Sequence, residues 1–262
     1  MRSISGRFGC LTALTQGMLR DTMADTKKSL SPTGKKNRFG KAWMQQHVND
    51  HWVQEAQRLG YRSRAAFKLA ELAEKDSLFR PGMAVVDLGS APGSWSQLLR
   101  ERLGRAARII ALDLVAMDPV AGVHFLQADF REAAGLDALA NSLEGRKVDL
   151  VVSDLAPNLS GVESADQARS VHLGELALEF AVRWLQPGGD FVVKAFQGEG
   201  FVEFQRSMKV HFDKVYVRKP KASRDRSREV YIVGKGFITL SPAHDKMPDK
   251  TPSGGASGAR GG

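Results

Sequence analysis

Short apolar runs alternate with amphipathic stretches along most of the chain. Five apolar runs have the length of buried strands, namely 84–88 (AVVDL), 108–114 (RIIALDL), 123–127 (VHFLQ), 148–154 (VDLVVSD) and 190–196 (DFVVKAF). Three stretches between them have the apolar spacing of helices, namely 94–102, 133–143 and 166–185. Strands that alternate with helices indicate βαβ units, so we predict a parallel sheet with helices on both faces.

The segments before and after this region complete the predicted fold. Apolar spacing predicts two helices ahead of the first strand, in 43–60 (WMQQHVNDHWVQEAQRLG) and 63–76 (SRAAFKLAELAEKD), with Ser63 as a cap of the second. Two more strand-like segments, 214–219 (KVYVRK) and 228–234 (REVYIVG), follow close together near the end. Their connection is too short for a crossover helix, so they should pair antiparallel. The prediction is one doubly wound α/β domain, with a seven-stranded, mostly parallel sheet and a terminal antiparallel hairpin.

Composition divides the chain into three parts. The 262 residues suffice for one sizeable α/β domain with tails. Residues 1–36 are rich in Ser, Thr, Gly and Lys without sustained periodicity, which predicts a disordered basic leader. Residues 37–240 then form the single folded domain, and residues 241–262 a flexible Gly/Ser tail. The leader has two interpretations: an organellar transit peptide over residues 1–22, or a translation start at Met23, which we favour.

Several classes of protein are excluded by what the sequence lacks. The apolar runs fall short of the roughly 18–20 residues that cross a bilayer, so we expect a cytoplasmic protein, or a mitochondrial one if a transit peptide is present. The single cysteine, Cys10, excludes an intrachain disulfide and a cysteine-cluster metal site. His47 and His51 are spaced as on one helix face but lack the glutamate of an HExxH motif, so no metal site is expected. No second apolar face is evident, and we expect a monomer.

Positive charge is concentrated in the N-terminal segment and in one internal segment. Residues 1–41 hold nine basic and two acidic side chains, whereas residues 42–240 hold 26 and 25. Within the latter, one short segment carries six basic residues against the single acid Asp225, namely Arg218, Lys219, Lys221, Arg224, Arg226 and Arg228. Such segments suit contact with RNA phosphates, with a solvated loop as the alternative. The aromatic residues Phe39, Trp43 and Trp52 are candidates for base stacking.

The loop after the first predicted strand, Gly89-Ser90-Ala91-Pro92-Gly93, is typical of a nucleotide-type cofactor site. It has neither the G-x-G-x-x-G spacing of a dinucleotide binder nor the lysine of a P-loop. Asp113, twenty residues past Gly93, is placed to bind two ribose hydroxyls, and Asp129 to reach an adenine amino group. Asp87 should lie near a positive charge of the ligand. An adenosine with a cationic group and no pyrophosphate describes S-adenosylmethionine. The alternative is that the loop is a turn for packing a helix against the sheet and that the acids are ordinary capping residues.

Four further residues have candidate chemistry. Lys194 stands near the end of an otherwise apolar strand, where a buried ammonium needs a partner, and Asp154 at the end of the preceding strand should be that partner. Glu229 starts the last strand, and Lys68 lies in the helix before the sheet. The alternatives are a strand-end lysine that snorkels and an exposed helix charge.

Over about residues 38–235 the chain resembles the FtsJ/RrmJ family of ribosomal RNA large-subunit 2′-O-ribose methyltransferases. Five motifs in order carry the resemblance, namely SRAAFKLAELAEKDSLFRPGMAVVDLGSAPGSWSQLL, DPVAGVHFLQADF, VVSDLAPNLSG, FVVKAFQGEGF and SREVYIVG. The resemblance implies a Rossmann-like S-adenosylmethionine-dependent methyltransferase fold. It also implies methylation of a uridine in the 23S rRNA A-loop, with large-subunit rRNA or the assembled large subunit as partner.

The resemblance also implies roles for individual residues. Lys68, Asp154, Lys194 and Glu229 match the family's catalytic tetrad. The residues that match its S-adenosylmethionine contacts are Gly93, Trp95, Asp113, Asp129 and Asp154. Ser94 departs from the family pattern because a second loop glycine is usual there, and it should be tolerated if its φ is negative.

The chemistry requires the 2′-hydroxyl to attack a sulfonium methyl in line, so the main contribution of the enzyme is to hold the two reactants in contact. Lys194 is the predicted base, because burial and the nearby ammonium of Lys68 would favour its neutral amine. Asp154 opposes that effect and is predicted to orient Lys194, while Glu229 positions Lys68 or the ribose. Two alternatives stay open: methylation of another RNA, such as tRNA or mitochondrial rRNA, and an inactive RNA-binding ribosome-assembly factor on the same fold.

Overall fold

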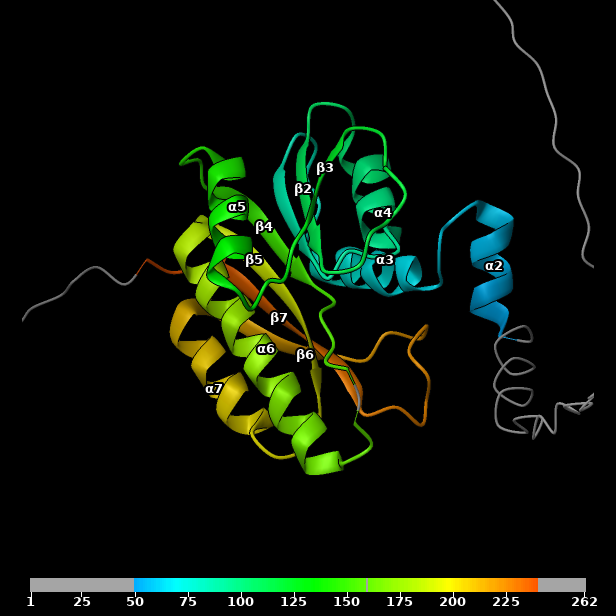
Figure 1. The fold of residues 1–262 in the computed structure, drawn as a ribbon. Helices are drawn as coiled ribbons and strands as arrows, with labels where there is room; N and C mark the ends of the chain where they lie inside the picture. Colours follow the sequence, from blue (N-terminus) through cyan, green and yellow to red (C-terminus); the bar gives the residue numbers. More distant parts are fainter. Residues whose placement is uncertain (1–49, 159, 240–262) are drawn as a thin grey trace, which may run out of the picture.

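The computed structural model describes residues 50–158 and 160–239 (Figure 1). Seven strands form one sheet, in the spatial order β3 (Val123–Gln127), β2 (Arg108–Asp113), β1 (Ala84–Leu88), β4 (Val148–Ser153), β5 (Leu185–Phe196), β7 (Glu229–Phe237) and β6 (Phe212–Arg218). The first five are mutually parallel, and β7 pairs antiparallel with both β5 and β6. The predicted parallel sheet and terminal antiparallel hairpin are therefore confirmed.

Helices cover both faces of the sheet (Figure 1). One face carries α5 (Ala133–Leu143), α6 (Glu163–Trp184) and α7 (Phe201–His211), and the other carries α3 (Ala65–Asp76) and α4 (Ser94–Leu103). Side chains alternate along a strand, so neighbouring residues enter different cores. In β1, Val86 packs with the α5–α7 face and Val85 with the α3–α4 face.

The sequence analysis missed α7. Its signal is short, since only Phe204 and Met208 are buried and the remaining positions are mostly polar or exposed. Those two residues lie one turn apart and pack into the core on the α6 side of the sheet. The helix carries the chain back from β5 to the edge strand β6, which starts directly after it.

The first predicted helix is corrected by the structure. The helix predicted in 43–60 does not run through Asp50, because this residue has an extended backbone and caps the helix that begins after it, α2 (His51–Leu59). The Asp50 carboxylate accepts a hydrogen bond from the backbone N–H of Trp52 at 3.0 Å, as N-cap residues do. Ser63 accepts from the N–H of Ala65 at 3.2 Å, one residue ahead of the assigned cap of α3. The leader, the Phe39–Trp43 segment, His47 and the Gly/Ser tail lie outside the described residues.

The strand order creates a switch point between β1 and β4. From β1 the chain moves outward to β2 and β3, and it then returns to β4 on the other side of β1. The loops at the carboxyl ends of β1 and β4 therefore lead to opposite faces of the sheet. Ligands of open α/β sheets bind in the crevice between two such loops. Gly89 allows the loops after β1 and β4 to lie in close contact. Its φ is +74°, and a Cβ built there would lie 2.8 Å from the backbone nitrogen of Leu155.

Candidate active site

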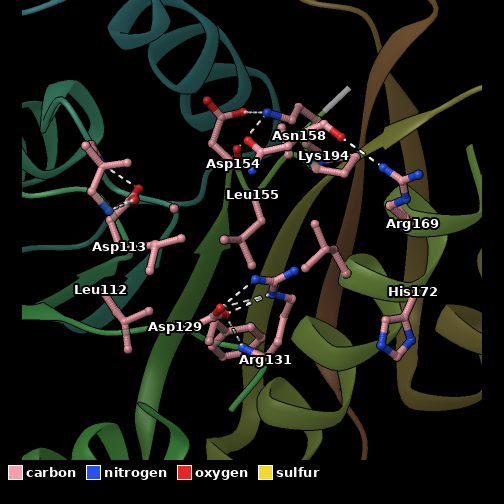
Figure 2. Close-up of a pocket in the computed structure, with 18 residues that line it drawn as sticks. Leu112, Asp113, Asp129, Arg131, Asp154, Leu155, Asn158, Arg169, His172 and Lys194 are labelled. Carbon is pink, nitrogen blue, oxygen red and sulfur yellow. Dashed lines mark hydrogen bonds and ion pairs between the residues drawn. The ribbon is translucent and has the colours of Figure 1, made fainter. Parts of the chain in front are cut away.

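A cavity of about 490 Å³ lies at the carboxyl ends of the parallel strands. Its walls come from the loops after β1, β2, β3 and β4, from the end of β5, and from α6 (Figure 2). The volume is within the range of small-molecule sites. Asp113, Asp129, Asp154 and Lys194 all line it, so four of the sequence-predicted residues meet in one place.

Asp113 is held by the two loops that flank it. One carboxylate oxygen accepts from the N–H of Ala91 at 2.9 Å, and the other accepts from the N–H of Val115 at 2.8 Å. Each carboxylate oxygen can accept more than one hydrogen bond. The side chain is thus fixed in position and still has acceptor capacity for ligand hydroxyls.

Asp129 lines the same cavity and is paired with Arg131 (Figure 2). The guanidinium of Arg131 lies 2.6 Å from a carboxylate oxygen, and its backbone N–H also donates to the carboxylate at 2.9 Å. These hydrogen bonds lower the pKa of Asp129 below its usual range. The carboxylate is therefore ionised, and it is an acceptor for an amino group.

Three residues expected at the cofactor do not line this cavity, and two of them belong to the first loop and to α4. Gly93 is covered by Arg62, whose guanidinium donates to the carbonyls of Pro92 and Pro119 and so closes the first loop against the β2–β3 loop. The indole of Trp95 is buried in the core and donates to the carbonyl of Ala65 at 2.8 Å.

Asp87, the third of these residues, requires a correction because it does not face the cavity. Its side chain is fully buried and accepts from the hydroxyl of Ser96 at 2.6 Å, while its other oxygen has no partner among the described residues. Burial raises its pKa to about 7. A strand-end position placed it at the correct edge of the sheet but did not reveal that its side chain is buried against Ser96 of α4.

Asp154 and Lys194 form the predicted pair. Nζ of Lys194 lies 2.6 Å from the backbone carbonyl of Asp154 and 3.1 Å from its Oδ1 (Figure 2). The Lys194 side chain is only 8% exposed, and what remains open faces the cavity that it lines. The alternative of a snorkelling lysine is thus excluded, because the amine is buried and held through two oxygens of one residue.

Lys68 and Glu229 form a second pair beside the first. Their Nζ and Oε1 atoms lie 2.7 Å apart, and both side chains are largely buried. Lys68 is therefore not an exposed helix charge. The same Glu229 oxygen accepts from the hydroxyl of Ser223 at 2.8 Å, which attaches the basic loop before β7 to this pair.

Tyr231, which the sequence analysis missed, connects the two pairs. Its hydroxyl donates to Oδ1 of Asp154 at 2.8 Å and accepts from Nζ of Lys68 at 3.4 Å. Burial and the neighbouring carboxylates raise its pKa well above the usual value, so it remains a neutral phenol. The available signal was the two-residue strand period, because Glu229 and Tyr231 point to the same side of β7 and Tyr231 is paired with Lys194 of β5.

The basic segment 218–228 is more structured than its charge suggested. Arg218 forms three hydrogen bonds to the buried carboxylate of Asp76, and its guanidinium stacks on Tyr216. Lys219 donates to the carbonyls of Ser227 and Glu229. These two cations therefore hold the fold, which leaves the later cations of the segment as the candidates for contact with RNA.

The remaining expectations concern the loop glycine, metals and membranes. Ser94 is the first residue of α4 and has no positive φ, so its departure from the family pattern is accommodated. Across residues 50–158 and 160–239, no three His, Cys, Asp or Glu side chains are grouped as metal ligands would be. In the same ranges no helix has the length and apolar character needed to cross a membrane.

Comparison with known proteins gives matches that cover this whole sheet. The model of the FtsJ-like methyltransferase family matches residues 61–237. A protein of Azoarcus sp. (strain BH72) named ribosomal RNA large subunit methyltransferase E is 60% identical over 200 residues, which are 76% of this chain and 98% of that protein. The protein of the same name from Methylobacillus flagellatus is 57% identical over 200 residues, covering 76% and 97%.

Among solved structures, a Plasmodium falciparum protein described as a ribosomal RNA methyltransferase superposes with a TM-score of 0.60. It is 32% identical and covers 68% of this chain and 98% of its own. The predicted Rossmann-like methyltransferase fold is therefore confirmed. Because the family match includes the cavity and both charged pairs that Tyr231 connects, the chain belongs to the FtsJ-like methyltransferase family.

Proposed function

We propose that this protein transfers a methyl group from S-adenosylmethionine to a ribose 2′-hydroxyl of large-subunit ribosomal RNA, with a uridine of the A-loop as the target. The names of its relatives support the substrate class. The cavity with its carboxylates and buried lysine supports the chemistry. Large-subunit rRNA or the assembled subunit is the proposed partner, and the proposed enzyme is a monomer.

The residues of the cavity fit the proposed cofactor. Asp113 has acceptor capacity for two ribose hydroxyls, and Asp129 is an ionised acceptor for the adenine amino group. Leu114 and Phe130 line the same cavity and supply apolar surface for a purine ring. When bound, S-adenosylmethionine supplies a methyl group on a positively charged sulfur. Gly93 and Trp95 stay predictions from the family resemblance.

Lys194 is the proposed proton acceptor. A neutral amine has two N–H donors and one lone pair. The carbonyl and carboxylate oxygens of Asp154 accept the two donors, which leaves the lone pair of Nζ for the substrate hydroxyl on the cavity side. When the ribose oxygen accepts the methyl group, the bonding pair of the carbon–sulfur bond would stay on the sulfur, which leaves as a neutral thioether, and the hydroxyl proton would pass to Nζ of Lys194.

Lys68, Glu229 and Tyr231 are proposed to hold this arrangement in place. Tyr231 donates to the carboxylate oxygen that also contacts Lys194, so it restricts the rotation of Asp154. Lys68 is fixed by Glu229 and carries a positive charge toward the Tyr231 hydroxyl.

One observation carries the proposal. The amine of Lys194 is buried and held through two oxygens, and it lines the same cavity as Asp113 and Asp129, the proposed cofactor-binding residues. The test is methyl transfer from labelled S-adenosylmethionine to large subunits that lack the modification, to free 23S rRNA and to bulk tRNA, with the labelled nucleotide mapped. Label on a ribose 2′-oxygen of the A-loop is the expected result.

The other outcomes discriminate between the alternatives. Label on tRNA would keep the chemistry and overturn the substrate. Binding of S-adenosylmethionine without transfer to any of these RNAs would favour an inactive assembly factor and would contradict the proposed function.

A further inference from the structure

Lys68, Asp154, Lys194, Glu229 and Tyr231 are linked by hydrogen bonds and ion pairs and are called the catalytic group below. A polar groove lies beside this group, outside the cofactor cavity. It consists of two adjoining hollows of about 450 and 380 Å³, and both are lined by Arg64, Arg224 and Arg226. The first hollow extends to Trp52 on α2, and the second extends to Glu229 at the start of β7. The groove thus runs from an aromatic side chain to the catalytic group.

The groove and the cofactor cavity approach the catalytic group from different sides. Glu229 lines the groove, whereas Asp154 and Lys194 line the cavity. Lys68 and the buried Tyr231 lie between, in contact with Glu229 and Asp154 respectively. When the 2′-hydroxyl of one ribose reaches Lys194, the RNA strand on either side of that nucleotide therefore has the groove as a neighbouring surface.

The walls of the groove are held by specific contacts. Arg64 is fixed by Asp50, with Nη1 2.7 Å from the carboxylate, and both side chains are largely buried. The opposite wall is attached to the catalytic group, since the buried Ser223 donates to Glu229 at 2.8 Å. Trp52 packs against Phe67 with the ring centroids 5.2 Å apart, which fixes the indole at the end of the groove.

The chemistry of the lining favours a single-stranded nucleotide. The arginines offer planar, permanently charged donors, which bind phosphate oxygens in pairs. An aromatic ring beside such donors is the usual combination for an unpaired nucleotide, because the base stacks while the phosphate is neutralised. Both carboxylates of the first hollow, Asp50 and Asp225, are outnumbered by its basic residues, namely Arg64, Lys221, Arg224 and Arg226.

We propose that this groove is a binding subsite for the nucleotide next to the methylated one, with its phosphate held by Arg64 and Arg224 and its base stacked on Trp52. The proposal rests on the proposed function and goes beyond it, because it assigns residues that select an unpaired RNA strand. It also divides the basic segment by function, since Arg224 contacts RNA whereas Arg218 and Lys219 maintain the fold.

The test compares variants of the full chain in methyl transfer to large-subunit rRNA that lacks the modification. Trp52→Ala should raise the KM for RNA about tenfold, since stacking on one base contributes about 1–3 kcal/mol. Trp52→Phe keeps an aromatic face and should remain within about threefold of the unmodified chain. Binding of S-adenosylmethionine should be unchanged in both variants, which separates a lost RNA contact from a general loss of structure.

Arg224→Gln tests the phosphate contact. It should weaken RNA binding and reduce the slope of log K against log salt by about one, as expected for one lost phosphate contact. Arg146→Gln is the matched control: it removes the same charge from an exposed side chain near the start of β4, far along the sheet from the groove. This control should keep the salt slope of the unmodified chain.

The outcomes separate the two proposals. If the unmodified chain methylates the RNA but Trp52→Ala and Arg224→Gln behave like Arg146→Gln, the subsite is wrong and the proposed function stands. If Trp52→Phe loses as much as Trp52→Ala, stacking is not the contact and the subsite is again contradicted. If the unmodified chain transfers no methyl group to RNA, the proposed function fails and the subsite fails with it.

Discussion

Lys194 enters the cavity with two of its hydrogen-bonding directions already taken by Asp154. The sequence predicted this pair, because each residue stands near the end of a neighbouring parallel strand and such ends meet at one edge of a sheet. It did not reveal Tyr231, since a tyrosine in a strand is usually an ordinary core residue. Strand period and register show it as the link, but the register between β5 and β7 is a property of the fold.

Replacement of Lys194 tests the proposed proton acceptor. Lys194→Ala should lower kcat by about 10²–10⁴-fold, the usual loss for a general base. Affinity for S-adenosylmethionine, measured by calorimetry, should stay within about threefold, because the proposed adenosine contacts are made by Asp113 and Asp129.

Two further variants serve as controls for Lys194→Ala. Lys194→Met retains the length of the buried side chain and should be as inactive as the alanine variant. Lys209→Ala removes an exposed lysine of α7 and should keep full activity. Turnover of Lys194→Ala within about threefold of the unmodified chain would exclude Lys194 as the proton acceptor.

Asp87 should make the stability of the protein depend on pH. Burial raises its pKa from 3.8 to about 7, so between these values the folded protein retains a proton that the unfolded chain has lost. The contribution of this carboxyl to the free energy of unfolding is therefore largest below about pH 4 and falls as pH rises to about 7.

The variant Asp87→Asn removes this dependence and nearly preserves the shape of the side chain. The difference in unfolding free energy between variant and unmodified chain should move in favour of the variant by about 2–3 kcal/mol from about pH 5 to about pH 8. Urea unfolding across that range measures it. A difference that does not change with pH would show that Asp87 ionises normally in the folded protein.

At the scale of elements, strand and helix positions in the core of the chain were predictable, and the exceptions have physical causes. The strand 84–88 and the helix 133–143 agree with β1 and α5 residue for residue. The start of α2 at His51 was not predicted, because an N-cap aspartate inside an amphipathic pattern is indistinguishable from an exposed helical aspartate.

The loop after β1 depends on Gly89 for two separate reasons. Its φ of +74° is unfavourable for any side chain, and a Cβ would meet the backbone nitrogen of Leu155 at 2.8 Å. Gly89→Ala should therefore lower the unfolding free energy by about 2–4 kcal/mol, the sum of backbone strain and overpacking. Affinity for S-adenosylmethionine should also fall, since Gly89 lines the cavity.

Gly145→Ala separates the two causes. Gly145 has a similar φ of +73° but no heavy atom within 4 Å of an added Cβ, so only strain applies. This variant should lose about 1–2 kcal/mol and keep its cofactor affinity. Equal losses of stability in both variants would mean that the β1 and β4 loops can move apart.

At the scale of the whole molecule, the sequence predicted the class of the sheet and its terminal hairpin but not the spatial order of the parallel strands. Alternating strands and helices indicated parallel pairing, whereas the placement of β4 beside β1 follows from packing of the completed chain. That placement brings Asp113 and Asp154, from opposite sides of the switch point, to one cavity. The same placement means that loops from both halves of the sheet line the cavity.

A ligand in this cavity contacts both halves of the sheet and should therefore stabilise the entire fold. S-adenosylmethionine at about a hundred times its Kd should add about 2.7 kcal/mol to the free energy of unfolding, which for a domain of this size raises the Tm by roughly 5–10 °C. Asp113→Ala removes the carboxylate that holds the loops after β1 and β2, so the shift at the same concentration should be lost. Asp137→Ala, at an exposed position on α5, should keep the full shift. A Tm that S-adenosylmethionine leaves unchanged in the unmodified chain would contradict the assignment of this cavity to the cofactor.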